Sequence, residues 1–138
     1  MDNYRRRLAV LMRLLPPADL AALRKGLASG DPALIHGGAT DPTVGDPALE
    51  CRGADLLAYG TWKARGLRTT AQVTEAWNDW HIAYETATGH CGEVRCLLAT
   101  WDGLEEMSRE RARAVALWVA DEEVERRRKP EGESHDQQ

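Results

Sequence analysis

The sequence predicts an all-α fold, a compact single-domain bundle of about five to six helices with a disordered C-terminal tail. Three observations support this prediction. Apolar residues recur every three to four positions in several segments, capping or breaking residues stand at the ends of those segments, and no segment alternates with the period of two that marks a strand. Because 138 residues is a common size for one domain, we assign 1–129 to the helical domain and 130–138 to the tail.

The first two helices are predicted at 3–15 and from Pro17 to Gly30. Apolar residues follow one helical face throughout the first of them. Proline suits the first position of the second helix because the backbone N–H that it lacks would have no partner there. Glycine is a common residue directly after the last helical turn, so Gly30 is the predicted end.

A near-repeat, Gly-Asp-Pro-Ala-Leu, occurs at 30–34 and again at 45–49. In each copy the Asp side chain can cap free backbone N–H groups while Pro takes the first position of a helical turn. We therefore predict a short helical turn at each copy, on either side of a loop at 37–45. A phosphate or metal role for the Asp pair is the alternative interpretation.

Four further helices are predicted at 54–65, 69–86, 92–101 and 108–128. The chain has five Trp and no Phe, so large apolar volumes in its core are expected to come from Trp, Leu and Val. We predict a Trp-rich core between two facing apolar stripes, formed by Val73, Trp77, Trp80 and Tyr84 on one helix and Val94, Leu98 and Trp101 on the next.

The charges of the chain are unevenly distributed around a net charge of −4. Residues 1–30 carry six basic and two acidic side chains, whereas residues 69–108 carry one basic and seven acidic side chains. An acidic protein is a poor candidate for non-specific binding to phosphates, so nucleic acid is not an expected partner. The acidic centre instead favours a basic protein surface, and Glu75, Asp79 and Glu85 are the predicted contact residues.

No stretch approaches the roughly 20 apolar residues that a membrane span requires. The N-terminal segment has three consecutive Arg but only a short apolar run after them, interrupted by Arg13 and followed by two Pro, which is not the pattern of a signal peptide. Three cysteines do not indicate a secreted disulfide framework. We therefore expect a cytoplasmic protein that does not contact the membrane.

A zinc site is one hypothesis for the cysteines. Cys51, His90, Cys91 and Cys96 together would supply three thiolates and one imidazole, which is a known structural zinc set. Cys91 and Cys96 are five positions apart, however, whereas structural zinc sites usually take two ligands from a tighter turn. Unlinked thiols are the alternative. A zinc-stabilised protein or small metalloenzyme, using the cysteines with His81 or His90, remains the second function hypothesis.

A third hypothesis is a DNA-binding helix-turn-helix at 54–86. The order of elements fits, but the second helix carries no Arg or Lys between Thr70 and Thr86 and has three carboxylates. Recognition helices present basic and amide side chains to DNA, so the residue types disfavour this function.

The last predicted helix has two opposed apolar faces, one with Val115 and Val119 and the other with Leu117, Ala120 and Val124. The second face is either buried in the core or forms a docking seam for a partner helix or a homodimer. No arrangement of nucleophile, acid and base is recognisable in the chain. The leading function hypothesis is therefore a non-enzymatic protein–protein interaction module, a small helical regulator or adaptor.

Overall fold

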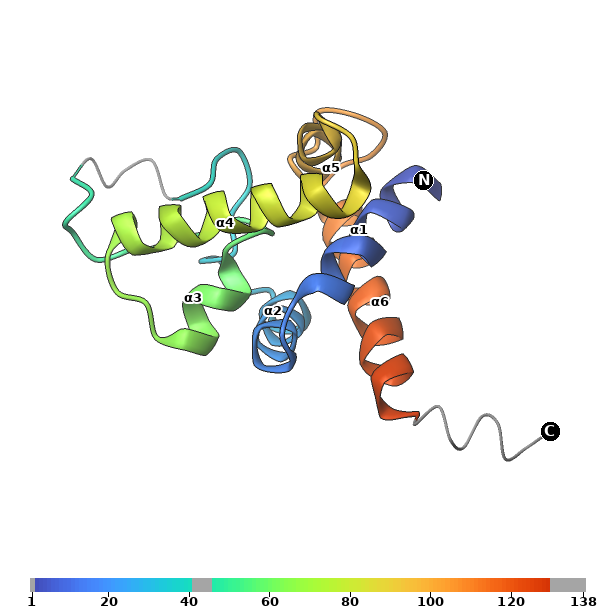
Figure 1. Ribbon diagram of the computed structural model, residues 1–138, viewed down its shortest axis with the longest axis horizontal. Helices are drawn as coiled ribbons and strands as arrows, with labels where there is room; N and C mark the ends of the chain where they lie inside the picture. The colour runs from blue at the N-terminus through green and yellow to red at the C-terminus, as the bar shows by residue number, and fades with distance from the viewer. Residues whose placement is uncertain (1, 41–45, 130–138) are drawn as a thin grey trace.

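The computed structural model describes residues 2–40 and 46–129 (Figure 1). Across these residues the chain is helical and has no strand, which confirms the all-α prediction. The helices are α1 (Asp2–Leu14), α2 (Pro17–Ser29), α3 (Tyr59–Arg65), α4 (Thr70–Thr88), α5 (Glu93–Trp101) and α6 (Arg109–Arg128). None of these described helices is both long and apolar enough to cross a membrane. The tail predicted to be disordered, 130–138, lies outside the described residues.

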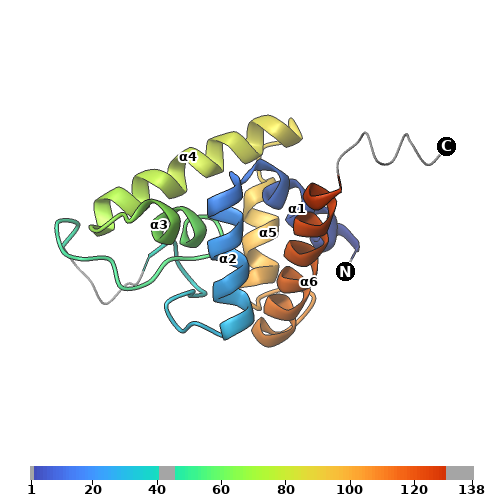
Figure 2. The ribbon, with the colours of Figure 1, turned by 90° about the horizontal axis from the view of Figure 1, so that it is seen from below.

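The helices pack as a bundle with α4 along one edge. Helices α1 and α6 lie side by side in both views, and α2 packs against both α6 and α3 (Figures 1 and 2). Helix α4 contacts α1, α3 and α5, and it extends beyond the bundle toward the loop that precedes α3. This placement leaves one side of α4 facing solvent.

The ends of the helices follow the capping signals in the sequence. At the start of α4, Thr69 Oγ1 accepts a hydrogen bond from Gln72 N at 3.2 Å, and Gln72 Oε1 accepts one from Thr69 N at 3.1 Å. This reciprocal pair satisfies two backbone donors that the helix itself leaves open. At the start of α6, Ser108 Oγ accepts a hydrogen bond from Arg111 N at 3.2 Å. Gly66 ends α3 with a φ of 64°, a conformation that glycine adopts without strain.

The helix predicted at 54–65 begins only at Tyr59. Its expected first turn is instead paired with the loop that follows α2. Ala54 N donates to Ala33 O at 2.9 Å, and Ile35 N donates to Ala54 O at 2.9 Å. Because both backbone groups of Ala54 are used in these long-range bonds, the segment is extended here and the helix starts later.

The two Asp residues of the near-repeat act as backbone caps, as predicted. Asp31 Oδ1 accepts a hydrogen bond from Ala33 N at 2.9 Å, and Asp46 Oδ1 accepts one from Ala48 N at 2.9 Å. Both segments are single turns rather than helices. Part of the predicted loop, 41–45, lies outside the described residues.

The core is rich in leucine rather than in tryptophan, so the predicted Trp-rich core is corrected. Trp62 and Trp101 are buried, the two Trp of α4 are half-buried, and Trp118 is 45% exposed. On α4 only Val73 and Tyr84 of the predicted stripe are buried, because this helix lies at the edge of the bundle. The fully buried leucines are Leu8, Leu11, Leu20, Leu23, Leu34, Leu56, Leu57 and Leu97.

Helix α3 packs closely on α2 at two glycines. A Cβ atom placed on Gly60 would lie 2.4 Å from the carbonyl oxygen of Asp19, and one placed on Gly26 would lie 2.4 Å from the ring of Tyr59. Cβ atoms do not approach other atoms so closely, so a larger residue at Gly60 would displace the backbone of α2, and one at Gly26 would displace the Tyr59 ring. The contact between the two helices also brings Thr61 of α3 against Asp19 of α2, which fixes one wall of the candidate site.

Candidate functional site

A groove of about 440 Å³ lies between α3 and α4. Its α4 wall carries Glu75 and Asp79, two of the three acidic residues predicted as a partner surface. They are four positions apart and therefore share one face of the helix. The residues that line the groove are Thr61, Arg65, Leu67, Gln72, Glu75, Ala76, Asp79, Trp80 and Ala83.

Two linked hydrogen bonds, one of them buried, fix the aromatic wall of this groove. Trp80 Nε1 donates to Thr61 Oγ1 at 2.7 Å, and Thr61 Oγ1 donates to Asp19 Oδ2 at 2.6 Å. Asp19 and Thr61 are 2% and 1% exposed, so water does not compete for the bond between them. The indole of Trp80 is thus held in one orientation, with the ring half-buried beside the two carboxylates.

The groove carries a net negative charge. Arg65 is its basic side chain, and its Nη2 lies 3.4 Å from Asp19 Oδ2, so a buried carboxylate already opposes that charge. Glu75 and Asp79 are exposed and form no ion pair or hydrogen bond with the described residues. Their two charges therefore face solvent at the rim of the groove, next to an aromatic face.

Glu85, the third residue of the predicted acidic surface, lies outside the groove. Its Oε1 accepts a hydrogen bond from Gly92 N at 3.0 Å and lies 3.3 Å from His81 Nε2. Its Oε2 is buried and makes no hydrogen bond within the described part of the chain. Glu85 joins the end of α4 to the start of α5, and only Glu75 and Asp79 of the predicted set are brought together.

The predicted docking seam on α6 is largely covered by the bundle itself. Ala120 is fully buried, so it offers no surface to another chain. Leu117 and Val124 are half-buried and pack against the core. The reason is that α6 contacts α1 on one side and α2 on the other, and Val124 lines a hollow shared with α2. Burial in the core, the alternative interpretation, accounts for Ala120.

The structure does not gather the candidate zinc ligands. Cys51 is buried before α3, where its Sγ donates to Gly53 O at 3.3 Å. Cys91 and His90 are exposed between α4 and α5, and Cys96 is half-buried on α5. Within the residues that the structure describes, no three His, Cys, Asp or Glu side chains are placed to hold a metal ion.

The buried partners of the groove were not identified from the sequence. The spacing of apolar residues that predicts α2 and α3 assigns no role to Asp19 or Thr61. One signal was present: Asp19, Leu23 and Gly26 are separated by four and three positions and so share the inner face of α2. An acidic residue on an apolar face indicates a buried hydrogen-bond partner from another element, and here that partner is Thr61.

Comparisons of the chain with protein-family models, with curated proteins and with solved structures found no match.

Proposed function

We propose that the chain is a non-enzymatic interaction module that binds a partner protein through the α3–α4 groove. The observation that carries this proposal is the pair of exposed carboxylates of Glu75 and Asp79 beside the immobilised indole of Trp80. A small helical regulator or adaptor is the class of protein that this surface fits.

The chemistry of the groove favours a basic side chain of the partner. A guanidinium or ammonium group that enters beside Trp80 can lie against the ring while its N–H groups donate to the two carboxylates. Arginine satisfies both requirements best because its planar fork stacks on aromatic rings and pairs with carboxylates at the same time. The partner segment is therefore expected to present at least one Arg.

The same groove disfavours the helix-turn-helix alternative. Helices α3 and α4 are joined by a short turn, which is the expected order of elements. The exposed groove between them, however, carries two carboxylates that would repel phosphate groups.

A peptide-binding experiment tests the proposal. The protein can be used as bait to select binders from a displayed library of randomised peptides. The selected peptides should be enriched in Arg. Binding of such a peptide to Glu75→Gln/Asp79→Asn should weaken at least about tenfold, since each charged pair across a partly desolvated interface contributes on the order of 1 kcal/mol or more. Raising the salt concentration should weaken binding to the wild type and have little effect on binding to the variant.

Glu105→Gln/Glu110→Gln is the matched control. These two residues are exposed and lie outside the groove, and the double substitution changes the net charge by the same amount. Peptide binding should survive in this control. Selected peptides without basic residues, or equal losses of affinity in both double variants, would contradict the proposed function.

A further inference from the structure

A second groove, of about 520 Å³, lies between α1 and α6, away from the α3–α4 groove. The two helices run side by side (Figures 1 and 2), and residues from both line the groove. Four arginines and two glutamates line this space together with two small apolar residues. The lining residues are Arg5, Arg6, Ala9, Arg13, Val119, Glu122, Glu123 and Arg126.

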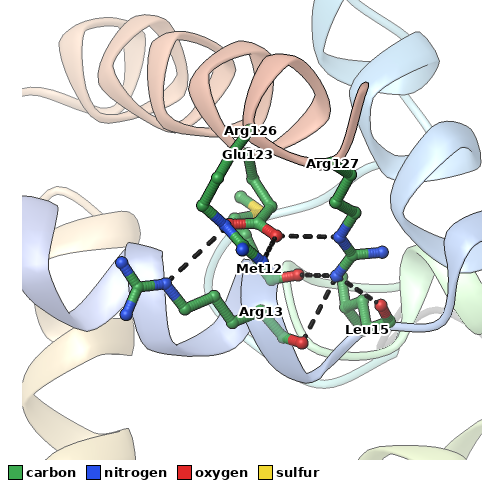
Figure 3. Close-up of polar contacts among 6 residues, drawn as sticks. All are labelled: Met12, Arg13, Leu15, Glu123, Arg126 and Arg127. Atoms are coloured by element: carbon green, nitrogen blue, oxygen red, sulfur yellow. Dashed lines mark hydrogen bonds and ion pairs between the residues drawn. The ribbon is translucent and has the colours of Figure 1, made fainter. Parts of the chain in front are cut away.

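Glu123 organises the basic side chains at one end of this groove. Its carboxylate is 5% exposed and accepts two hydrogen bonds from Arg126, at 3.0 and 2.6 Å, and one from Arg127 at 2.8 Å (Figure 3). Burial opposes the ionisation of Glu123, but the two guanidinium groups outweigh it and hold its pKa below the ordinary value. Glu123 is therefore an ionised carboxylate that already accepts three hydrogen bonds from side chains of α6.

The other carboxylate of the groove is also occupied. Glu122 Oε1 accepts a hydrogen bond from Arg5 Nη2 at 3.3 Å. The guanidinium of Arg5 stacks on Trp118, with its carbon 3.9 Å from the ring centroid, which limits its movement. Arg5 uses one of its five N–H donors in the bond to Glu122, and its Nε makes no hydrogen bond within the described residues.

Arg6 and Arg13 supply the excess positive charge. Arg6 is exposed and makes no ion pair with the described residues, although it also borders the neighbouring hollow that contains Glu93. Arg13 is 64% exposed, and its Nε lies 3.9 Å from Glu123 Oε1, beyond hydrogen-bond distance. Figure 3 shows Arg13 approaching Glu123 from the side opposite Arg127. Two guanidinium groups thus flank the groove without a full counter-charge.

We propose that the α1–α6 groove binds the phosphate dianion of a small phosphomonoester. Two excess positive charges match the charge of that group near neutral pH, and guanidinium forks match the geometry of its oxygens. The volume is within the range of small-molecule sites and exceeds what a phosphate ion alone would fill. Ala9 and Val119 provide apolar contact for the organic part of the ligand.

Calorimetric titration of the full chain with glucose 6-phosphate, in a buffer without phosphate, tests this site. We expect saturable binding to the wild type and none of glucose. Arg6→Ala/Arg13→Ala should weaken binding at least about tenfold, whereas Arg52→Ala/Arg68→Ala, which removes the same charge from exposed positions elsewhere, should change it by less than about twofold. Lowering the pH from about 7.5 to about 5 should weaken binding several-fold because the second phosphate pKa is about 6.

Several results would overturn the proposal. No heat of binding at millimolar glucose 6-phosphate, equal binding of glucose, or equal losses in both double variants would each exclude a phosphate site in this groove. Vesicles that contain phosphatidic acid form a parallel arm, because that lipid carries the same phosphomonoester group. Vesicle binding that depends on Arg6 and Arg13, without binding of the free sugar phosphate, would contradict a small-molecule ligand and assign the groove to a lipid headgroup.

Discussion

Asp55 lies buried just before α3, where Oδ1 accepts a hydrogen bond from Leu57 N at 3.0 Å and Oδ2 accepts one from Trp77 Nε1 at 2.9 Å. Burial raises the pKa of this carboxyl to about 7, although both hydrogen bonds favour the charged form. The folded protein therefore retains a proton on Asp55 at pH values where the unfolded chain, with a pKa of 3.8, has lost it.

The sign of the resulting pH dependence follows from this difference. Between about pH 4 and pH 7 the folded state binds more protons at this site, so Asp55 favours folding less as the pH rises. Asp55→Asn does not titrate, so wild-type stability relative to this variant should fall by about 2 to 3 kcal/mol between pH 4.5 and 7.5, at about 1.4 kcal/mol per unit of pH.

Urea unfolding of both proteins across this pH range measures the difference. A constant offset against Asp55→Asn is expected at every pH, because the amide NH2 cannot accept one of the two native hydrogen bonds. Only the change with pH is diagnostic of the Asp55 proton. Parallel pH profiles of the two proteins would show that Asp55 is ionised in the folded state.

At the scale of the elements, the contact between α2 and α3 determines the α3–α4 groove. Gly60 allows the backbone of α3 to reach Asp19, and this approach places Thr61 where it can connect Asp19 to Trp80. Gly60→Ala removes that clearance. In an unobstructed helix the change would stabilise by about 1 kcal/mol, but here the new methyl group overlaps the Asp19 carbonyl oxygen.

We expect Gly60→Ala to lower the free energy of unfolding by about 1 to 3 kcal/mol, the usual cost of overpacking. The indole N–H resonance of Trp80 should also shift, because the Thr61 hydroxyl that accepts its hydrogen bond is displaced. Thermal unfolding and a ¹H–¹⁵N correlation spectrum measure the two effects. A more stable variant with an unchanged indole resonance would show that the close approach is not needed.

At the scale of the whole molecule, Arg127 of the last helix contacts the C-terminal end of the first helix. Its Nη2 donates to Met12 O at 2.8 Å, to Arg13 O at 3.3 Å and to Leu15 O at 2.8 Å, while its Nε donates to Glu123 (Figure 3). The first two carbonyls belong to the last turn of α1, where the helix leaves acceptors without partners, and Leu15 follows directly after it. The guanidinium of Arg127 therefore holds the end of α1 against α6.

Arg127→Met should lower the free energy of unfolding by about 2 to 4 kcal/mol, because it removes charge-assisted bonds and one of the partners of a buried carboxylate. Arg128→Met is the matched control. Arg128 is exposed and pairs with Glu125 at 3.3 Å, so its loss should cost less than about 0.5 kcal/mol. Equal midpoints of urea unfolding for the two variants would show that Arg127 does not stabilise the contact between α1 and α6.

Much of the fold is determined by interactions between residues close together in the sequence, and that part could be predicted from the sequence. The spacing of apolar residues, the capping pair Thr69 and Gln72, and the stop at Gly66 determine where helices begin and end, because those interactions join residues within a few positions of one another. The same local spacing placed Glu75 and Asp79 on one face of α4. The start of α3 was predicted too early because long-range bonds to the loop after α2 override helix formation there.

The tertiary structure alone decided what covers each helical face. Periodicity shows that Leu117, Ala120 and Val124 share a face of α6, but only the packing of other helices against α6 buries Ala120. It likewise places Trp80 against Thr61 and brings the arginines of α1 opposite those of α6. The physical reason is that spacing along one helix fixes directions around its own axis, whereas burial depends on which distant segments pack beside it.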